Sequence, residues 1–250
     1  MKKTKLFQDD YLRQKYLSRG ELKKLSESYR VISVKNENTR TFWNEKIVKG
    51  LSFDEQDMMT RDRIFSAVKL VGVNKKIKLL DIGAGYGYFE EILNKEKGKV
   101  IMYGIDISNL AVTSLRKKFD GTFKVGLANN IPFQNELFDV VVALEIIEHI
   151  PAEDSISVYS EIKRVLKNRG VFICSVPVFE TYTEKYNPNA HMRAYTPELF
   201  ESELKINGFN IQKKKLFYAF NNLYSVKKFI SKIVKRWKPN VILVKSVVIK

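Results

Sequence analysis

The chain has 250 residues, of which 44% are apolar, and a formal net charge of +16. This length allows one domain with a sizeable core and short appendages. No uncharged apolar run reaches the roughly 18 residues of a membrane-spanning helix, and charged residues stand where a signal peptide needs its apolar stretch. We therefore expect a cytoplasmic protein. Its single cysteine, Cys174, lies in an apolar run and is expected to fill core volume.

The basic charge gathers at the two ends of the chain. Residues 1–50 contain 13 Lys and Arg against 6 Asp and Glu, and residues 201–250 contain 12 against 2. The residues between them contain 19 against 20. The two ends can therefore face an anionic surface, substrate or nucleic acid, or they can carry solvated lysine side chains that have no partner.

Residues 1–76 lack the alternating pattern that is typical of strands. They contain apolar residues at helical spacing between polar joints, and the last predicted helix covers about 55–72. We expect a helical N-terminal cap or lid, with a domain boundary near residues 73–76.

From Ile77 onward, short β-branched apolar runs alternate with stretches of helical spacing, a pattern typical of a wound α/β sheet. The predicted strands cover 77–82, 100–106, 122–126, 137–144, 170–176, 209–217 and 240–250. The predicted helices cover 86–96, 108–119, 152–168 and 197–207. Residues 77–250 are thus expected to form one α/β domain, with a seven-stranded, mostly parallel sheet and helices on both faces.

A glycine loop follows the first predicted strand and leads directly into a helix. Gly83, Gly85 and Gly87 leave backbone N–H groups pointing at whatever lies above the sheet. Asp81 ends the first strand and Asp106 the second, where a carboxylate can accept both hydroxyls of a ribose. The spacing differs from the dinucleotide fingerprint, because the third glycine comes one residue early. Another kind of nucleotide-binding domain is therefore an alternative.

Five segments, in order along the chain, carry a family resemblance: LLDIGAGYGYF (79–89), YGIDIS (103–108), GLANNIPF (126–133), FDVVVALEIIEHI (138–150) and EIKRVLKNRGVFICSVP (161–177). Together they resemble the class I S-adenosylmethionine-dependent methyltransferases, over roughly residues 77–217. The resemblance implies a Rossmann-like fold and S-adenosylmethionine (SAM) as the cofactor. The cofactor-binding residues that it implies are Asp81, Gly83, Ala84, Gly85, Gly87, Asp106, Ile107, Ala128, Asn129, Leu144 and Glu145.

One position departs from the family pattern. Leu127 stands where the family usually has an acidic residue that reaches the adenine amino group. In our interpretation, Asn129 replaces that contact.

Carboxylates and imidazoles cluster after the fourth predicted strand. Glu145, Glu148 and His149 follow it closely, and His191 lies in the loop before the helix at 197–207. These four candidate catalytic residues can bind a divalent metal such as Mg²⁺, which would lower the pKa of an acceptor hydroxyl. The segment is similar to that of ubiquinone-pathway O-methyltransferases and small-RNA ribose methyltransferases, in which a metal assists. Alternatively, His149 is a metal-free base, or the group is structural.

A basic helical insertion is predicted at about 221–236, between the last two strands. Its apolar stripe consists of Phe229, Ile230, Ile233, Val234 and Trp237, with lysines and an arginine around it. Such a helix can lie in a membrane interface, which would suit peripheral contact with the inner membrane face and a lipid-linked acceptor. Alternatively, the stripe docks on the sheet.

The sequence therefore predicts a SAM-dependent methyltransferase that acts on a hydroxyl of a small-molecule or lipid-linked acceptor. RNA is an alternative acceptor, because both ends are basic and aromatic residues stand among the lysines. A catalytically inactive SAM-fold binding protein is a third hypothesis, since a fold does not fix a function.

Overall fold

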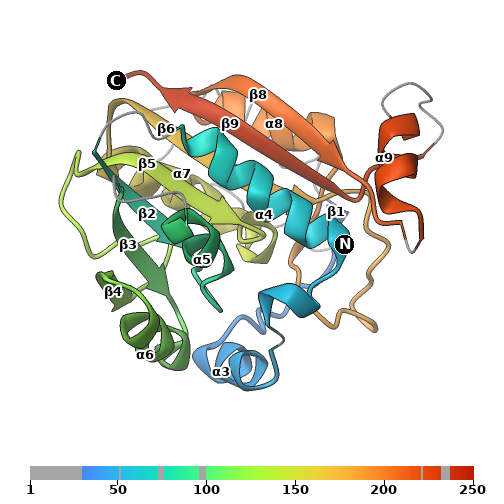
Figure 1. Cartoon of the computed structure of the whole chain (residues 1–250), viewed down its shortest axis with the longest axis horizontal. Helices are drawn as coiled ribbons and strands as arrows, with labels where there is room; N and C mark the ends of the chain where they lie inside the picture. The colour runs from blue at the N-terminus through green and yellow to red at the C-terminus, as the bar shows by residue number, and fades with distance from the viewer. Residues whose placement is uncertain (1–29, 51, 73–75, 96–99, 221, 232–236) are drawn as a thin grey trace.

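One sheet organises the computed structural model, which describes residues 30–50, 52–72, 76–95, 100–220, 222–231 and 237–250 (Figure 1). In this part of the chain the sheet contains seven strands. In spatial order they are β4 (Gly121–Val125), β3 (Val100–Asp106), β2 (Ile77–Ile82), β5 (Phe138–Leu144), β6 (Leu166–Pro177), β9 (Val241–Val248) and β8 (Phe209–Phe217). The predicted α/β class and the seven-stranded sheet are confirmed.

The order and direction of the strands create a crevice at the carboxyl ends of the central strands. The five strands from β4 to β6 are parallel, and β9 is antiparallel to both β6 and β8. The chain moves from β2 outward to β3 and β4, and then returns to place β5 and β6 on the other side of β2. Connections therefore leave in opposite directions from the carboxyl ends of β2 and β5, which is where ligands bind in open α/β sheets.

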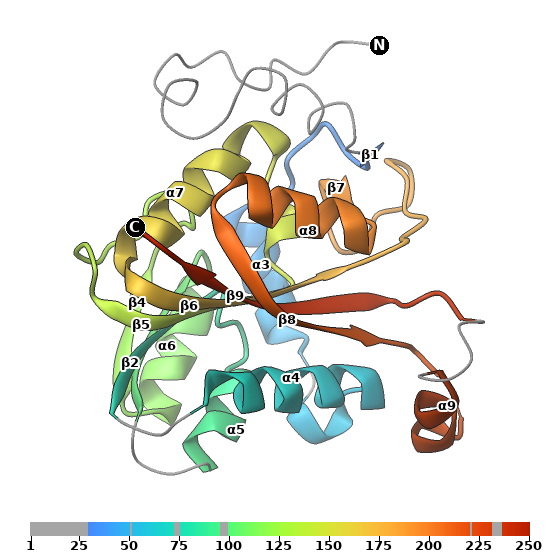
Figure 2. The ribbon, with the colours of Figure 1, turned by 90° about the horizontal axis from the view of Figure 1, so that it is seen from above.

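Helices cover both faces of the sheet, as Figure 2 shows. One face carries α4 (Met58–Val71), α5 (Tyr88–Lys95) and α6 (Asn109–Lys118), and the other carries α7 (Ser155–Val165) and α8 (Pro197–Ile206). Each helix buries one stripe; α7, for example, buries Val158, Tyr159, Ile162 and Val165. This spacing matches the helical period of the apolar residues in the sequence. The side chain of Ser108 caps α6, as the sequence predicts.

The predicted N-terminal cap consists of two different parts within the described residues. α4 packs its apolar side chains with those of α5 and the sheet, so this helix belongs to the layered core. α3 (Arg40–Val48) has no buried residue and lies beside α6. Residues 1–29 and most of the predicted boundary, 73–75, lie outside the described residues.

Two features of the fold differ from the sequence prediction. The helix predicted over 152–168 ends at Val165, because Leu166 is fully buried and already pairs with Phe138 of β5. A two-residue strand, β1 (Arg30–Val31), pairs with β7 (Arg193–Ala194) although the first 76 residues show no strand pattern. Such a short ladder leaves no periodicity in the sequence.

The predicted basic insertion contains α9 (Tyr224–Ser231). Residues 221 and 232–236, with Ile233 and Val234 of the predicted stripe, lie outside the described residues. No helix in the described part of the chain is long and apolar enough to cross a membrane.

A buried ion pair holds together the loops that follow β5 and precede α8. Arg193 and Glu203 are almost fully buried, and Arg193 Nη1 lies 3.1 Å from Glu203 Oε2. The hydroxyl of Tyr159 donates to Glu203 at 2.7 Å. Arg193 also donates to the carbonyl oxygens of Ile147 and Ile150, both at 2.9 Å. The pair therefore fixes the 147–150 turn against the segment that carries residue 191.

Removing the carboxylate of this pair is expected to destabilise the protein strongly. Glu203→Ala leaves a buried guanidinium without its counter-charge, so the free energy of unfolding should fall by about 3–5 kcal/mol. Glu201→Ala on the same helix removes a pair with the exposed Lys214 and should cost less than about 1 kcal/mol. Urea denaturation of both variants measures the difference. Equal losses would show that the buried pair has no special role.

Candidate functional site

The glycine loop closes the carboxyl end of β2 and starts α5. Gly83 has a φ of 74°, and a Cβ atom there would lie 2.0 Å from Ile146 Cδ1. Only glycine fits this close approach and this left-handed backbone. Gly85, with a φ of 52°, has no atom closer than 3.8 Å to an added Cβ, so its backbone faces open space. The loop thus presents backbone atoms to the crevice above the sheet.

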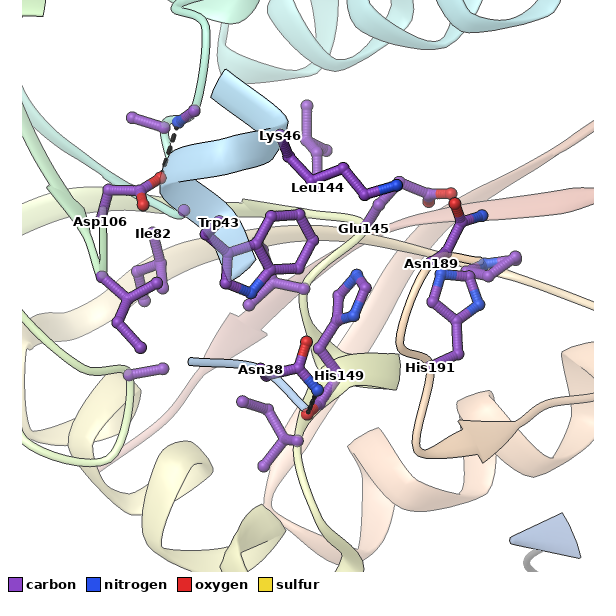
Figure 3. A pocket seen from close by; sticks show the side chains of 18 of the residues that line it. Asn38, Trp43, Lys46, Ile82, Asp106, Leu144, Glu145, His149, Asn189 and His191 are labelled. Atoms are coloured by element: carbon purple, nitrogen blue, oxygen red, sulfur yellow. Dashed lines mark hydrogen bonds between the residues drawn. The ribbon is translucent and has the colours of Figure 1, made fainter. Parts of the chain in front are cut away.

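Asp106 ties the end of β3 to this loop. Its carboxylate accepts the N–H of Gly85 at 2.9 Å and the N–H of Ser108 at 2.8 Å (Figure 3). Burial raises the pKa of Asp106, and the two backbone N–H groups oppose this shift. Since each carboxylate oxygen has two lone pairs, the group can still accept hydrogen bonds from a ligand.

Two further carboxyl groups are buried behind the loop. Burial raises the pKa of Asp81 well above its usual range, and the neighbouring Glu90 adds to this shift. Burial also raises the pKa of Glu90 to about 7. The two side chains form a coupled pair of acids whose negative charge a nearby cation would stabilise.

A cavity of about 1130 Å³ extends from the glycine loop across the carboxyl ends of β2, β3 and β5. The predicted site residues that line it are Asp81, Gly83, Ala84, Gly85, Asp106, Ile107, Ala128, Asn129, Leu144, Glu145, His149 and His191. Gly87 and Glu148 are not among the lining residues: Gly87 faces Phe119 and Leu115, and Glu148 is buried beside the cavity. Leu127, which stands where the resembled family usually has an acidic residue, also lines the cavity.

α3 lines part of the cavity. The sequence predicts a helical cap, but it does not indicate which residues of the cap reach the cavity. Trp43 and Lys46 line the cavity from this helix, and Figure 3 shows Trp43 between Asp106 and His149. The Ser108 hydroxyl donates to Asn44 at 2.7 Å, which joins α3 to the start of α6. In the sequence, the only sign that α3 lines the cavity is the aromatic Trp43 in a mainly polar helix.

Glu145 occupies a strained position directly after β5. Its φ is 57°, which is unusual for a residue other than glycine and is typical of functional sites. Its carboxylate accepts a hydrogen bond from Ser175 at 2.8 Å and lies 3.3 Å from Arg63 Nη1. Arg63, which sequence reasoning missed, is a buried cation on α4 and also lines the cavity. Glu145 therefore pairs with Arg63 and does not belong to the cluster of Glu148, His149 and His191.

Glu148, His149 and His191 come together as the sequence predicted. Ligand atoms of these three side chains lie within 4.8 Å of one another. Glu148 is fully buried, and neither of its carboxylate oxygens has a hydrogen-bond partner among the described residues. Burial and the nearby Glu145 raise the pKa of Glu148 well above its usual range. An unpartnered buried carboxylate of this kind is costly unless a proton or a cation accompanies it.

The two imidazoles are oriented by neighbours on the far side of each ring. His149 Nδ1 lies 3.4 Å from the Ala190 carbonyl, and His191 Nδ1 lies 2.8 Å from Glu180 Oε2. Burial, and then the nearby His191, lower the pKa of His149 to about 3, so its ring is neutral at pH 7. Each ring therefore has its Nε2 atom left to accept a proton or bind a cation.

The N-terminal segment also reaches this cluster. Asn38 Nδ2 donates to the carbonyl oxygens of His149 at 3.2 Å and Ala190 at 2.9 Å. The Trp43 ring stands edge to face against His149, with 4.9 Å between the ring centroids. Residues of α3, of the glycine loop and of the histidine cluster thus face one cavity (Figure 3).

Comparison with known proteins identifies the domain. A family model described as a methyltransferase domain matches residues 80–174. An uncharacterized protein of Methanocaldococcus jannaschii is 27% identical over 187 residues, which cover 73% of this chain and 78% of that protein. The ubiquinone biosynthesis O-methyltransferase of Histophilus somni is 30% identical over 112 residues, and the match spans 42% of this chain and 46% of the enzyme.

A solved structure shows the same fold. A chain of the complex between the Haloferax volcanii Trm112 methyltransferase activator and a methyltransferase superposes with a TM-score of 0.65 at 19% identity, covering 87% of this chain and all of that one. The matched segment 80–174 contains the glycine loop, Asp106 and the Glu148-His149 pair. Residues 80–174 therefore form a methyltransferase domain, within a chain that has the fold of SAM-dependent methyltransferases.

Proposed function

We propose that this protein transfers a methyl group from SAM to a hydroxyl of a small-molecule or lipid-linked acceptor. The observation that carries the proposal is the single cavity that joins the Gly83–Asp106 region to His149 and His191. A methyl donor bound at one end would direct its methyl group toward an acceptor at the other. Because the sulfonium is already activated, alignment and removal of one proton are the main tasks left to the protein.

The donor would be held by groups of complementary charge. Asp106 would accept the ribose hydroxyls, as a carboxylate at the end of the second strand does in such sheets. Asp81 and Glu90 would place negative charge near the donor's positively charged methionine end. Asn129, beside Leu127, would contact the adenine amino group. Each role follows from the position of the side chain in or beside the cavity.

A divalent cation fits the acceptor side of the cavity. Glu148 supplies a carboxylate without a hydrogen-bond partner among the described residues, and His149 and His191 supply ring nitrogens; the ligand atoms lie within 4.8 Å of one another. Two imidazoles suit a transition metal such as Mn²⁺ or Zn²⁺ better than Mg²⁺, which prefers oxygen ligands. When bound, such an ion would act as a Lewis acid on the acceptor oxygen. Without an ion, His149 would be a weak base, because its pKa lies at about 3.

The names of several relatives support a small-molecule or lipid-linked acceptor. The Histophilus somni relative is a ubiquinone biosynthesis O-methyltransferase, although the match covers less than half of that enzyme. The cavity walls combine apolar side chains such as Trp43, Ile146 and Phe179 with the polar cluster. RNA as the acceptor and an inactive binding protein stay as the two competing hypotheses.

Loss of the Asp106 carboxylate is expected to weaken donor binding. Asp106→Ala removes hydrogen bonds to two ribose hydroxyls, each worth about 1.5–3 kcal/mol because the acceptor is charged. The dissociation constant for SAM, measured by isothermal titration calorimetry, should rise at least about tenfold. The matched control, Asp120→Ala, removes an exposed carboxylate and should leave it unchanged. Identical affinities of the wild type and Asp106→Ala would contradict this role.

Donor binding is also expected to depend on pH through Glu90. The pKa of this group is raised from 4.5 to about 7, so its charge is present above pH 7 and is lost as the pH falls toward 5. The affinity for the positively charged donor should therefore rise about tenfold between pH 5 and pH 8. Glu90→Gln should flatten this profile, whereas Glu91→Gln, at a partly exposed neighbour on the same helix, should not. A flat wild-type profile would refute the role of the pair.

The cation site is tested by direct binding. The wild type should bind Mn²⁺ in electron paramagnetic resonance titrations, and Glu148→Gln should weaken that binding at least about tenfold. Glu153→Gln, an exposed carboxylate five residues further along the chain, serves as the control. Absence of Mn²⁺ and Zn²⁺ binding, together with unchanged thermal stability in EDTA, would remove the metal hypothesis and leave methyl transfer itself untouched.

A further inference from the structure

α9 exposes an apolar face to solvent. Leu223, Val226, Phe229 and Ile230 are 68%, 54%, 64% and 37% exposed, whereas large apolar side chains in the other helices are mostly buried. Val226 and Ile230 are four residues apart, so they share one side of the helix; Phe229 lies at the edge of that side, and Leu223 directly precedes the helix. The predicted stripe is thus not docked on the sheet where the structure describes it.

The opposite side of α9 is anchored to the domain. The Tyr224 hydroxyl donates to Asp62 Oδ2 at 3.0 Å, and Lys228 Nζ lies 2.6 Å from the same oxygen. Lys215 also contacts Asp62, at 3.4 Å. Figures 1 and 2 both place α9 beyond the ends of β8 and β9, where it contacts Asp62 of α4. The helix is therefore held with its apolar face directed outward.

The segment around α9 carries only positive charge. Residues 218–240 contain six Lys and Arg, no Asp or Glu, and five aromatic residues. The one acidic group that α9 contacts, Asp62, is already paired with two lysines. A surface that combines exposed aliphatic and aromatic side chains with unopposed basic residues is complementary to a bilayer that contains anionic lipid. RNA would match the charge, but it would leave the aliphatic face in water.

The same segment continues into the rim of the methyltransferase cavity. Asn240, the last residue of the segment, and Val241 line the cavity, and the Asn240 carbonyl accepts the N–H of Val178 at 2.8 Å. Lys238 Nζ lies 5.5 Å from the centre of the ring of Phe179, which is 38% exposed and lines the cavity. A membrane that contacts α9 would therefore lie next to the cavity entrance.

We propose that α9, together with Lys227 and Lys238, docks this protein on the surface of a membrane that contains anionic lipid. Phe229 and Val226 enter the interface, and the lysines face the lipid headgroups. Docking of this kind brings an amphiphilic acceptor to the cavity entrance; this consequence rests on the proposed methyl transfer, whereas the docking itself does not.

The docking is tested by co-sedimentation of the full chain with vesicles. The protein should bind vesicles of equal parts phosphatidylcholine and phosphatidylglycerol at low salt, and it should bind pure phosphatidylcholine much more weakly. Phe229→Ser should weaken binding at least about tenfold, because a large apolar side chain no longer enters the interface. Lys227→Ala should weaken it about fivefold, and more so at low salt.

Two control variants change similar side chains elsewhere. Leu110→Ser alters a side chain on α6 that is 40% exposed, and Lys117→Ala removes an exposed charge from the same helix. Both should bind vesicles like the wild type. All four variants alter partly or fully exposed side chains, so each should keep the wild-type unfolding temperature and affinity for SAM.

Three outcomes would overturn the proposal. The first is that Phe229→Ser binds each vesicle type as strongly as the wild type does. The second is that the protein retains RNA but does not bind vesicles. The third is that light scattering shows a stable dimer, which Phe229→Ser dissociates. Failure of the methyltransferase assignment is distinguishable, because it would appear as absent SAM binding in a protein that still sediments with vesicles.

Discussion

The hydrogen bond from the Gly85 N–H to the Asp106 carboxylate joins the ends of β2 and β3, and the end of the cavity proposed to bind SAM depends on it. It fixes the glycine loop over the point where the chain reverses its direction across the sheet. The loop can approach Ile146 only because Gly83 lacks a side chain. The same carboxylate is buried and still has accepting capacity, so one group combines a structural role with the proposed binding of the ribose.

The part of the cavity lined by His149 and His191, which we propose holds the acceptor, depends on the buried ion pair of Arg193 and Glu203. Arg193 reaches the carbonyl oxygens of the turn that contains Glu148 and His149, and its neighbours in β7 pair with β1. Groups from distant parts of the chain are therefore held around one cavity. This arrangement places a carboxylate without a hydrogen-bond partner among the described residues next to two imidazoles, of which that of His149 is neutral at pH 7. Alignment of donor and acceptor would follow from this rigidity.

The sequence predicts the sheet and the position of the glycine loop well because both leave local signals. Buried parallel strands appear as β-branched runs, and Gly83, Gly85 and Asp106 stand at strand ends. The end of α7 could not be read locally, since Leu166 continues the helical pattern but pairs with Phe138. Arg63 and Glu180 were missed, because their roles arise only when α4 and the 178–192 segment pack beside Glu145 and His191. The exposure of Phe229 likewise depends on where α9 is anchored.

The central claim is that the cavity binds a methyl donor between the glycine loop and the histidine cluster. The most direct measurement is a crystal structure of the protein with S-adenosylhomocysteine, the demethylated form of SAM. We expect the ribose hydroxyls on Asp106 and the sulfur directed toward the side of the cavity lined by His149 and His191. Electron density for the nucleoside at another surface, or none under conditions that saturate binding in solution, would contradict the account.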